Sequence, residues 1–125
     1  MPPQVRLSRL AYCVRDVAAD AAEARRRIEL AEETLATARP LLEPFDPQKA
    51  DLLFRLGSWQ HALGVMSQAG SEEARAAFHA GSRSLLESAQ QFALVCGEAE
   101  KPTAAAKELA GLCMRSLKAA RQARS

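Results

Sequence analysis

Aromatic residues are scarce in this chain: Phe, Tyr and Trp make up 5% of its 125 residues, with one Trp and one Tyr. Runs of Val, Ile and Thr are absent too, and so is any stretch of 18 apolar residues that could cross a membrane. Alanine and other strong helix formers are abundant instead. The composition therefore excludes a β-rich core and a membrane partner, and it predicts an all-α fold.

The three cysteines contain no CxxC pair and cannot all be bridged within one chain. This count is typical of a reducing compartment, where each thiol acts as a small hydrophobe, and we expect a cytoplasmic protein. The two histidines, His61 and His79, have no further metal ligand one turn away on their own helices. The sequence therefore predicts no metal and no cofactor.

Catalytic patterns are missing as well. We find no nucleophile paired with a base, no glycine-rich phosphate loop and no pair of carboxylates suited to acid and base roles. The charge is uneven: residues 1–100 carry eleven Lys and Arg against fourteen Asp and Glu, whereas residues 101–125 carry six against one. A non-enzymatic protein with a basic C-terminal end is therefore expected.

The strongest pattern is a heptad repeat from Leu7 to Leu42, with apolar residues spaced alternately three and four apart. It predicts a long amphipathic helix over about 4–38, which ends before Pro40 because proline removes an N–H and disfavours helix in the residue before it. The members of this seam are Leu7, Leu10, Val14, Val17, Ala21, Ala24, Ile28, Ala31, Leu35, Ala38 and Leu42.

Three further helices are predicted over about 47–69, 72–96 and 103–123. Gly70 and Ser71 separate the first two within a tight turn, which makes them an antiparallel hairpin. Gly81, in mid-helix, predicts a close helix crossing. The predicted inward residues are Leu52, Leu56, Trp59, Leu63 and Met66; Ala74, Phe78, Gly81, Leu85, Ala89, Phe92 and Cys96; and Ala106, Leu109, Cys113, Leu117 and Ala120.

Together these elements predict one domain over residues 1–125. Its fold class is all-α: a four-helix antiparallel bundle in up-down-up-down order, or two stacked helical hairpins, with a long first helix.

Part of this pattern resembles a tetratricopeptide repeat. Leu53, Leu56 and Gly57 stand where the first helix of that family has its W-x2-L-G signature, and Ala74, Phe78 and Gly81 follow the pattern of its second helix. About one and a half repeats are covered, and the turn between the helices is about five residues longer than in the family. The resemblance implies binding of a peptide or protein in a concave groove.

The functional hypothesis is a protein-protein interaction or adaptor module that self-associates. A helix over 4–38 extends past its shorter neighbours, which leaves Leu7, Leu10 and Val14 to be covered by a second copy, most simply in a homodimer, or by another protein partner. A bend near residues 18–22 is the competing explanation. Arg121 and Arg124 mark a basic surface, and the alternative function is binding of nucleic acid or an acidic partner there.

Overall fold

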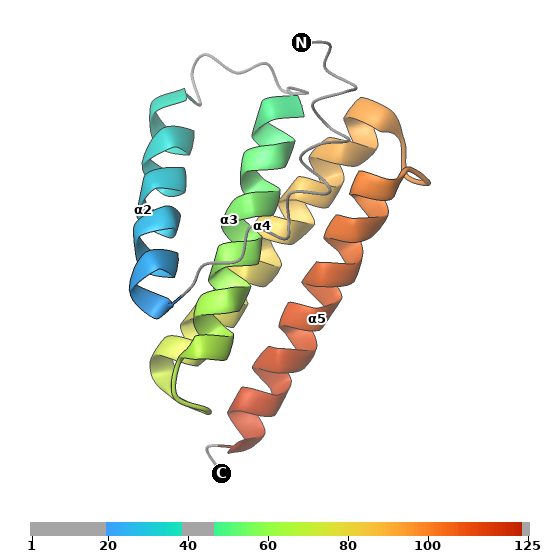
Figure 1. Ribbon diagram of the computed structural model, residues 1–125. Coiled ribbons are helices and arrows are strands. Elements are labelled where there is room, and N and C mark those ends of the chain that lie inside the picture. The colour runs from blue at the N-terminus through green and yellow to red at the C-terminus, as the bar shows by residue number, and fades with distance from the viewer. Residues whose placement is uncertain (1–19, 39–46, 124–125) are drawn as a thin grey trace.

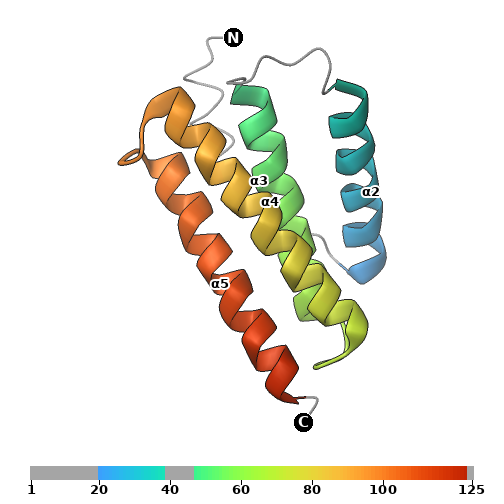
Figure 2. The same ribbon diagram turned by 180° about the vertical axis from the view of Figure 1, so that it is seen from behind.

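The computed structural model describes residues 20–38 and 47–123, which form four helices and no strand (Figure 1). The helices are α2 (Ala21–Ala38), α3 (Pro47–Met66), α4 (Glu72–Cys96) and α5 (Lys101–Ala123). Successive helices run in opposite directions, as both faces of the molecule show (Figures 1 and 2). The predicted all-α, antiparallel fold class is confirmed.

Helix α2 begins later than the heptad pattern predicts. The Asp20 carboxylate accepts a hydrogen bond from the backbone N–H of Glu23 at 2.8 Å, and the Asp20 carbonyl accepts one from Ala24 at 3.0 Å. These are the contacts of an N-cap residue, and α2 accordingly begins at Ala21. This start falls within residues 18–22, where a bend was the alternative interpretation of the sequence. Residues 1–19 lie outside the described part of the chain.

A close crossing joins α3 to α4. A Cβ placed on Gly81 would stand 3.2 Å from the backbone oxygen of Gly57 and 3.2 Å from Cys113 Sγ. A Cβ on Gly57 would lie 2.4 Å from Cγ of Leu85, which is completely buried. The predicted crossing at Gly81 is therefore confirmed, and it depends on glycine in both helices.

Helix α3 is buried on two faces, whereas the sequence predicted one. Part of the predicted seam does pack against α2, where Leu56 joins Ile28 and Leu35 in a buried cluster, but Met66 is 37% exposed. The second face meets α4 and includes Phe54, whose ring contacts Phe92 edge-on at 6.3 Å between centroids. A helix between two neighbours needs two apolar stripes. The buried residues of this second face are Ala50, Phe54, Gly57 and Gly64.

The predicted caps hold, with shifted helix ends. Ser71 accepts a hydrogen bond from the N–H of Ala74 at 3.1 Å, and Gly70 has a positive φ of 74°. Helix α3 nevertheless ends at Met66, three residues before the predicted end at 69, and the turn occupies the difference. Helix α5 begins at Lys101, two residues early, because the N–H of Ala104 already bonds to the carbonyl of Glu100 at 3.0 Å.

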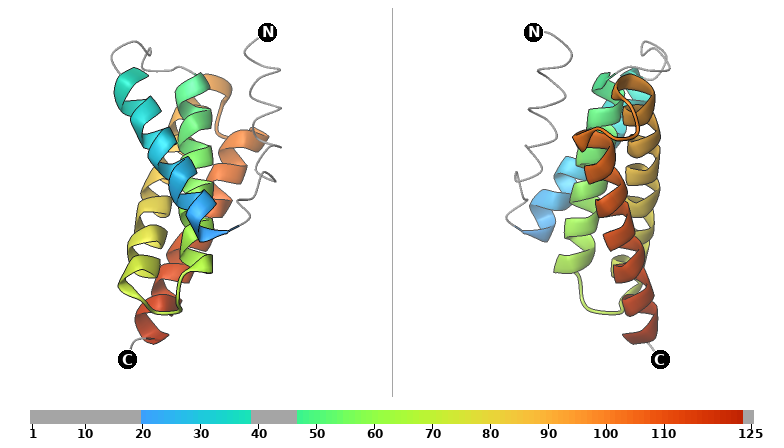
Figure 3. Two further views of the ribbon diagram at one scale, coloured as in Figure 1. Left: turned by 60° about the vertical axis from the view of Figure 1, so that its left-hand side comes forward. Right: turned by 90° about the vertical axis from the view of Figure 1, so that its right-hand side faces the viewer.

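The four described helices form a row rather than a closed square. Extensive contacts join α2 to α3, α3 to α4 and α4 to α5, with a smaller contact between α3 and α5. Helices α2 and α5 accordingly lie at opposite sides of the α3–α4 pair (Figures 1 and 3). Because α2 rests on α3, a groove is left between α2 and α4.

Candidate docking groove

The groove runs between α2 and α4, over α3, and encloses about 840 Å³. In Figure 2, α4 lies in front of α3, and α2 lies to the right of this pair. Its apolar floor includes Leu35, Leu53 and Leu56, each no more than 6% exposed. The complete lining is Glu32, Leu35, Ala36, Leu53, Leu56, Gln60, Ala80, Arg83, Ser84, Leu86, Glu87 and Gln90. An apolar floor between polar walls is typical of a site that holds an amphipathic segment.

One polar side chain is built into this floor. Gln60 is only 7% exposed, and its Oε1 accepts a hydrogen bond from Ser84 Oγ at 2.7 Å, which ties α3 to α4. Its amide nitrogen carries two donors, and no described residue accepts from them. Gln60 lines the groove and this nitrogen is not fully enclosed by protein atoms, so an occupant of the groove can reach its donors. The floor thus offers hydrogen bonds to an occupant that supplies an acceptor.

The two walls carry charges of opposite sign. Glu32 projects from α2 and Arg83 from α4, and both are exposed. Neither has an ion-pair partner among the described residues. Glu87, also on the α4 wall, lies 3.9 Å from Lys49 Nζ, at the limit of an ion pair. Glu32 and Arg83 are therefore free to meet charges that an occupant brings.

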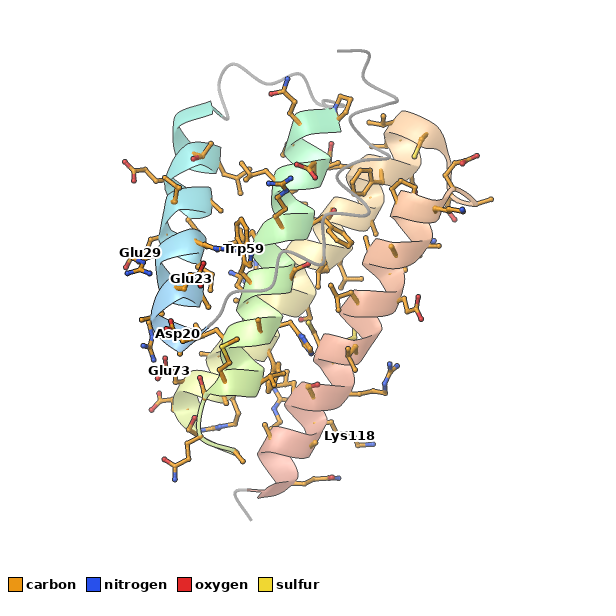
Figure 4. All side chains as sticks on the ribbon, in the orientation of Figure 1. Asp20, Glu23, Glu29, Trp59, Glu73 and Lys118 are labelled. Atoms are coloured by element: carbon orange, nitrogen blue, oxygen red, sulfur yellow. The ribbon has the colours of Figure 1, made fainter. Side chains whose placement is uncertain are left out.

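An ion pair sets the register between the walls. Arg25 Nε, in the second turn of α2, donates to Glu73 Oε1 at 3.0 Å, which shows that the start of α2 lies beside the first turn of α4, where Figure 4 labels Glu73. Both helices run in the same direction (Figure 1). Glu32 follows Arg25 by seven residues and Arg83 follows Glu73 by ten. At about 1.5 Å per residue, the two charges differ in height by roughly 4.5 Å, less than one helical turn.

The hypothesis placed the contact residues elsewhere. Leu7, Leu10, Val14 and Arg124 lie outside the described residues, so the predicted apolar overhang and most of the predicted basic surface stay predictions. Arg121 is exposed in the last turn of α5, a helix that contributes nothing to the groove lining.

Trp59 differs from the expected inward residue. It is half-buried rather than buried, and Arg27 of α2 lies over its ring at 5.6 Å from the centroid (Figure 4). This cation-π contact joins α2 to α3.

The histidines and cysteines form no reactive cluster in the described residues. His61 is half-buried with its ring 5.6 Å from that of Phe78, and burial lowers its pKa. His79 is exposed. No three His, Cys, Asp or Glu side chains within 20–38 and 47–123 could share a metal ion. Burial raises the pKa of Cys113 to about 11, which keeps its thiol protonated.

A smaller cavity of about 320 Å³ lies at the end of the row near the α3–α4 turn. Phe78 is its only aromatic wall, and its other walls are mostly Gly, Ala and Ser. A Cβ on Gly64 would lie 2.6 Å from the Phe78 ring, so the glycine is explained by packing. Nothing polar is buried and unpartnered in this cavity, and we assign it no role.

The groove was missed because a single seam was assigned to α3. Ala50, Gly57 and Gly64 are spaced seven apart and form a stripe of small residues, which is a signal for a second close helix neighbour. With both faces assigned, Gln60 falls between them as a polar residue in a buried position. The sequence therefore held a marker for this site.

Comparisons with protein-family models, with curated proteins and with solved structures each gave no match to this chain. Within the described helices, none combines the length and the apolar character that a bilayer-spanning segment needs.

Proposed function

We propose that this protein is a non-enzymatic interaction module that holds an amphipathic helix in the groove of α2, α3 and α4. The observation that carries the proposal is Gln60: a side chain 93% buried at the floor of a groove, with two amide donors left to the groove. An occupant that covered this amide without supplying an acceptor would leave its donors unpaired at a cost in free energy, so the floor favours an occupant that has an acceptor.

The groove suits a helix rather than a small molecule. Its α4 wall extends from Ala80 to Gln90, about 15 Å along the helix axis, and it is open along this length. Leu35, Leu53 and Leu56 offer an apolar track to a stripe of side chains spaced three and four apart. The tetratricopeptide resemblance, which implies peptide binding in a concave groove, supports the same function.

An adaptor role fits the chemistry of the described residues. Cys113, whose raised pKa leaves it a neutral thiol, is packed in the core and serves as a small hydrophobe. The groove itself contains no histidine or cysteine, and its charged residues are Glu32, Arg83 and Glu87. These support recognition of charge rather than bond making.

A displayed library of amphipathic helical peptides tests this proposal. Binders selected on the wild type should lose affinity for an Ala80→Arg variant, which fills the groove from the α4 wall. An Ala104→Arg variant, in an exposed position of α5, is the matched control and should bind as the wild type does. A library that yields no binders, or binders that Ala80→Arg leaves unaffected, would remove the proposal.

A further inference from the structure

Two unpaired charges on the groove walls indicate what occupies it. Glu32 and Arg83 stand on opposite walls at nearly the same height, and neither is neutralised among the described residues. An occupant that satisfies both must present a positive group to the α2 wall and a negative group to the α4 wall. A second copy of this chain has both charges at matching heights.

We infer that the groove is a homodimer interface in which α4 of each copy enters the groove of the other. The inference rests on the proposed helix-docking function and names its partner. A two-fold axis parallel to the helices exchanges the copies without changing heights along the groove, so Arg83 of one copy meets Glu32 of the other, twice per dimer. Such reciprocal contacts are the property of an isologous interface.

The exposed face of α4 has the composition that the groove requires. Leu86 and Leu94 are 42% and 60% exposed, large values for leucines on a helix whose other face is buried. Counted from the Arg25–Glu73 contact, Leu86 lies three residues further along α4 than Leu35 lies along α2, a difference in height of roughly 4.5 Å. Leu86 of one copy therefore reaches the apolar floor of the other copy. Glu87 and Gln90, on the same face, supply acceptor atoms for the Gln60 amide.

Charge reversal separates this interface from other modes of association. Glu32→Lys places two like-charged contacts in its own homodimer, and so does Arg83→Glu, because symmetry doubles every change. Each variant alone should therefore dissociate about tenfold or more readily than the wild type. In an equimolar mixture of the two variants, both contacts become opposite in charge again, and a mixed dimer should form with near wild-type affinity.

Sedimentation equilibrium on the full chain measures these constants. Glu33→Lys and Lys118→Glu make the same charge changes outside the groove lining and should leave the dimer unchanged, alone or mixed. Glu32 and Arg83 are exposed, so thermal melts of their variants should overlay with one another at a concentration where all are monomeric.

Two results would overturn the inference. One is a wild type that remains monomeric at millimolar concentration. The other is a dimer that persists in both variants, or that the mixture fails to restore. Peptide binding that Ala80→Arg abolishes would still support the docking function in either case, so the failure of this inference is distinguishable from the failure of that function.

Discussion

Replacing Gly57 with alanine tests the close crossing of α3 and α4. In an exposed helix position the change would stabilise the protein by up to about 1 kcal/mol, because alanine is the better helix former. Here the new Cβ would lie 2.4 Å from Leu85 Cγ, with the two Cδ atoms at 3.0 and 3.1 Å. Leu85 is completely buried, and the contact involves its branch carbon rather than a flexible end, so the helices must separate.

The magnitude follows from these opposing terms. Overpacking of a buried site costs about 1–3 kcal/mol, and a contact this short belongs at the upper end of that range. After the gain in helix propensity, we expect a net loss of about 2 kcal/mol, or a melting temperature about 8 °C lower for a domain of this size. Urea unfolding followed by circular dichroism measures the free energy directly.

Gly111→Ala is the matched control. Its added Cβ would meet only the Nη1 atom of Arg115, at 3.4 Å, which is the mobile end of a flexible side chain. This variant should gain up to about 1 kcal/mol. In a Leu85→Ala background, where the obstructing atoms are gone, Gly57→Ala should change from destabilising to neutral or stabilising. If Gly57→Ala and Gly111→Ala shift stability in the same direction, the account of the crossing is wrong.

Two further predictions concern titratable groups. Burial lowers the pKa of His61 below its ordinary 6.5, so the unfolded chain binds more protons than the folded chain near that pH, and the free energy of unfolding should fall as pH decreases below about 6.5. His61→Gln should therefore reduce the slope of the unfolding free energy against pH. Parallel slopes for the wild type and the variant would contradict this. The Cys113 thiol, with its pKa raised to about 11, should resist iodoacetamide at pH 8 until the chain unfolds, while the half-buried Cys96 reacts sooner, as mass spectrometry of the labelled peptides would show; equal native rates would refute it.

Much of the fold could be predicted because local signals agree with tertiary packing. The seam of α4 was predicted correctly: Phe78, Leu85 and Phe92 are all buried there. These residues belong to one regular apolar stripe of α4, and both neighbouring helices, α3 and α5, pack against it. Helix α4 also has its predicted bounds, Glu72 to Cys96, with Ser71 as its N-cap and Gly97 as its C-cap, since capping depends on residues close in sequence.

The errors arise where packing depends on several helices at once. The apolar spacing continues past Asp20, but it does not show that the Asp20 carboxylate caps a helix there. The prediction from the heptad pattern therefore missed this N-cap. The sequence marks Gln60 as a polar residue in a buried position, but it does not predict the groove itself, because the groove exists only where α2 contacts α3 without closing on α4. Apolar spacing shows which faces of a helix are buried, but not the distance between two helices, such as α2 and α4, that both pack on a third.

The order of the helices in the row has a kinetic consequence. Every extensive contact among α2, α3, α4 and α5 joins helices that are consecutive along the chain. The α3–α4 and α4–α5 connections, over residues 67–71 and 97–100, are short, so little chain entropy is lost in bringing those helices together. Helical domains with such local contacts fold in microseconds to milliseconds. We expect the α3–α4 hairpin, which has the largest of these interfaces, to form first, with α2 and α5 adding to its two sides.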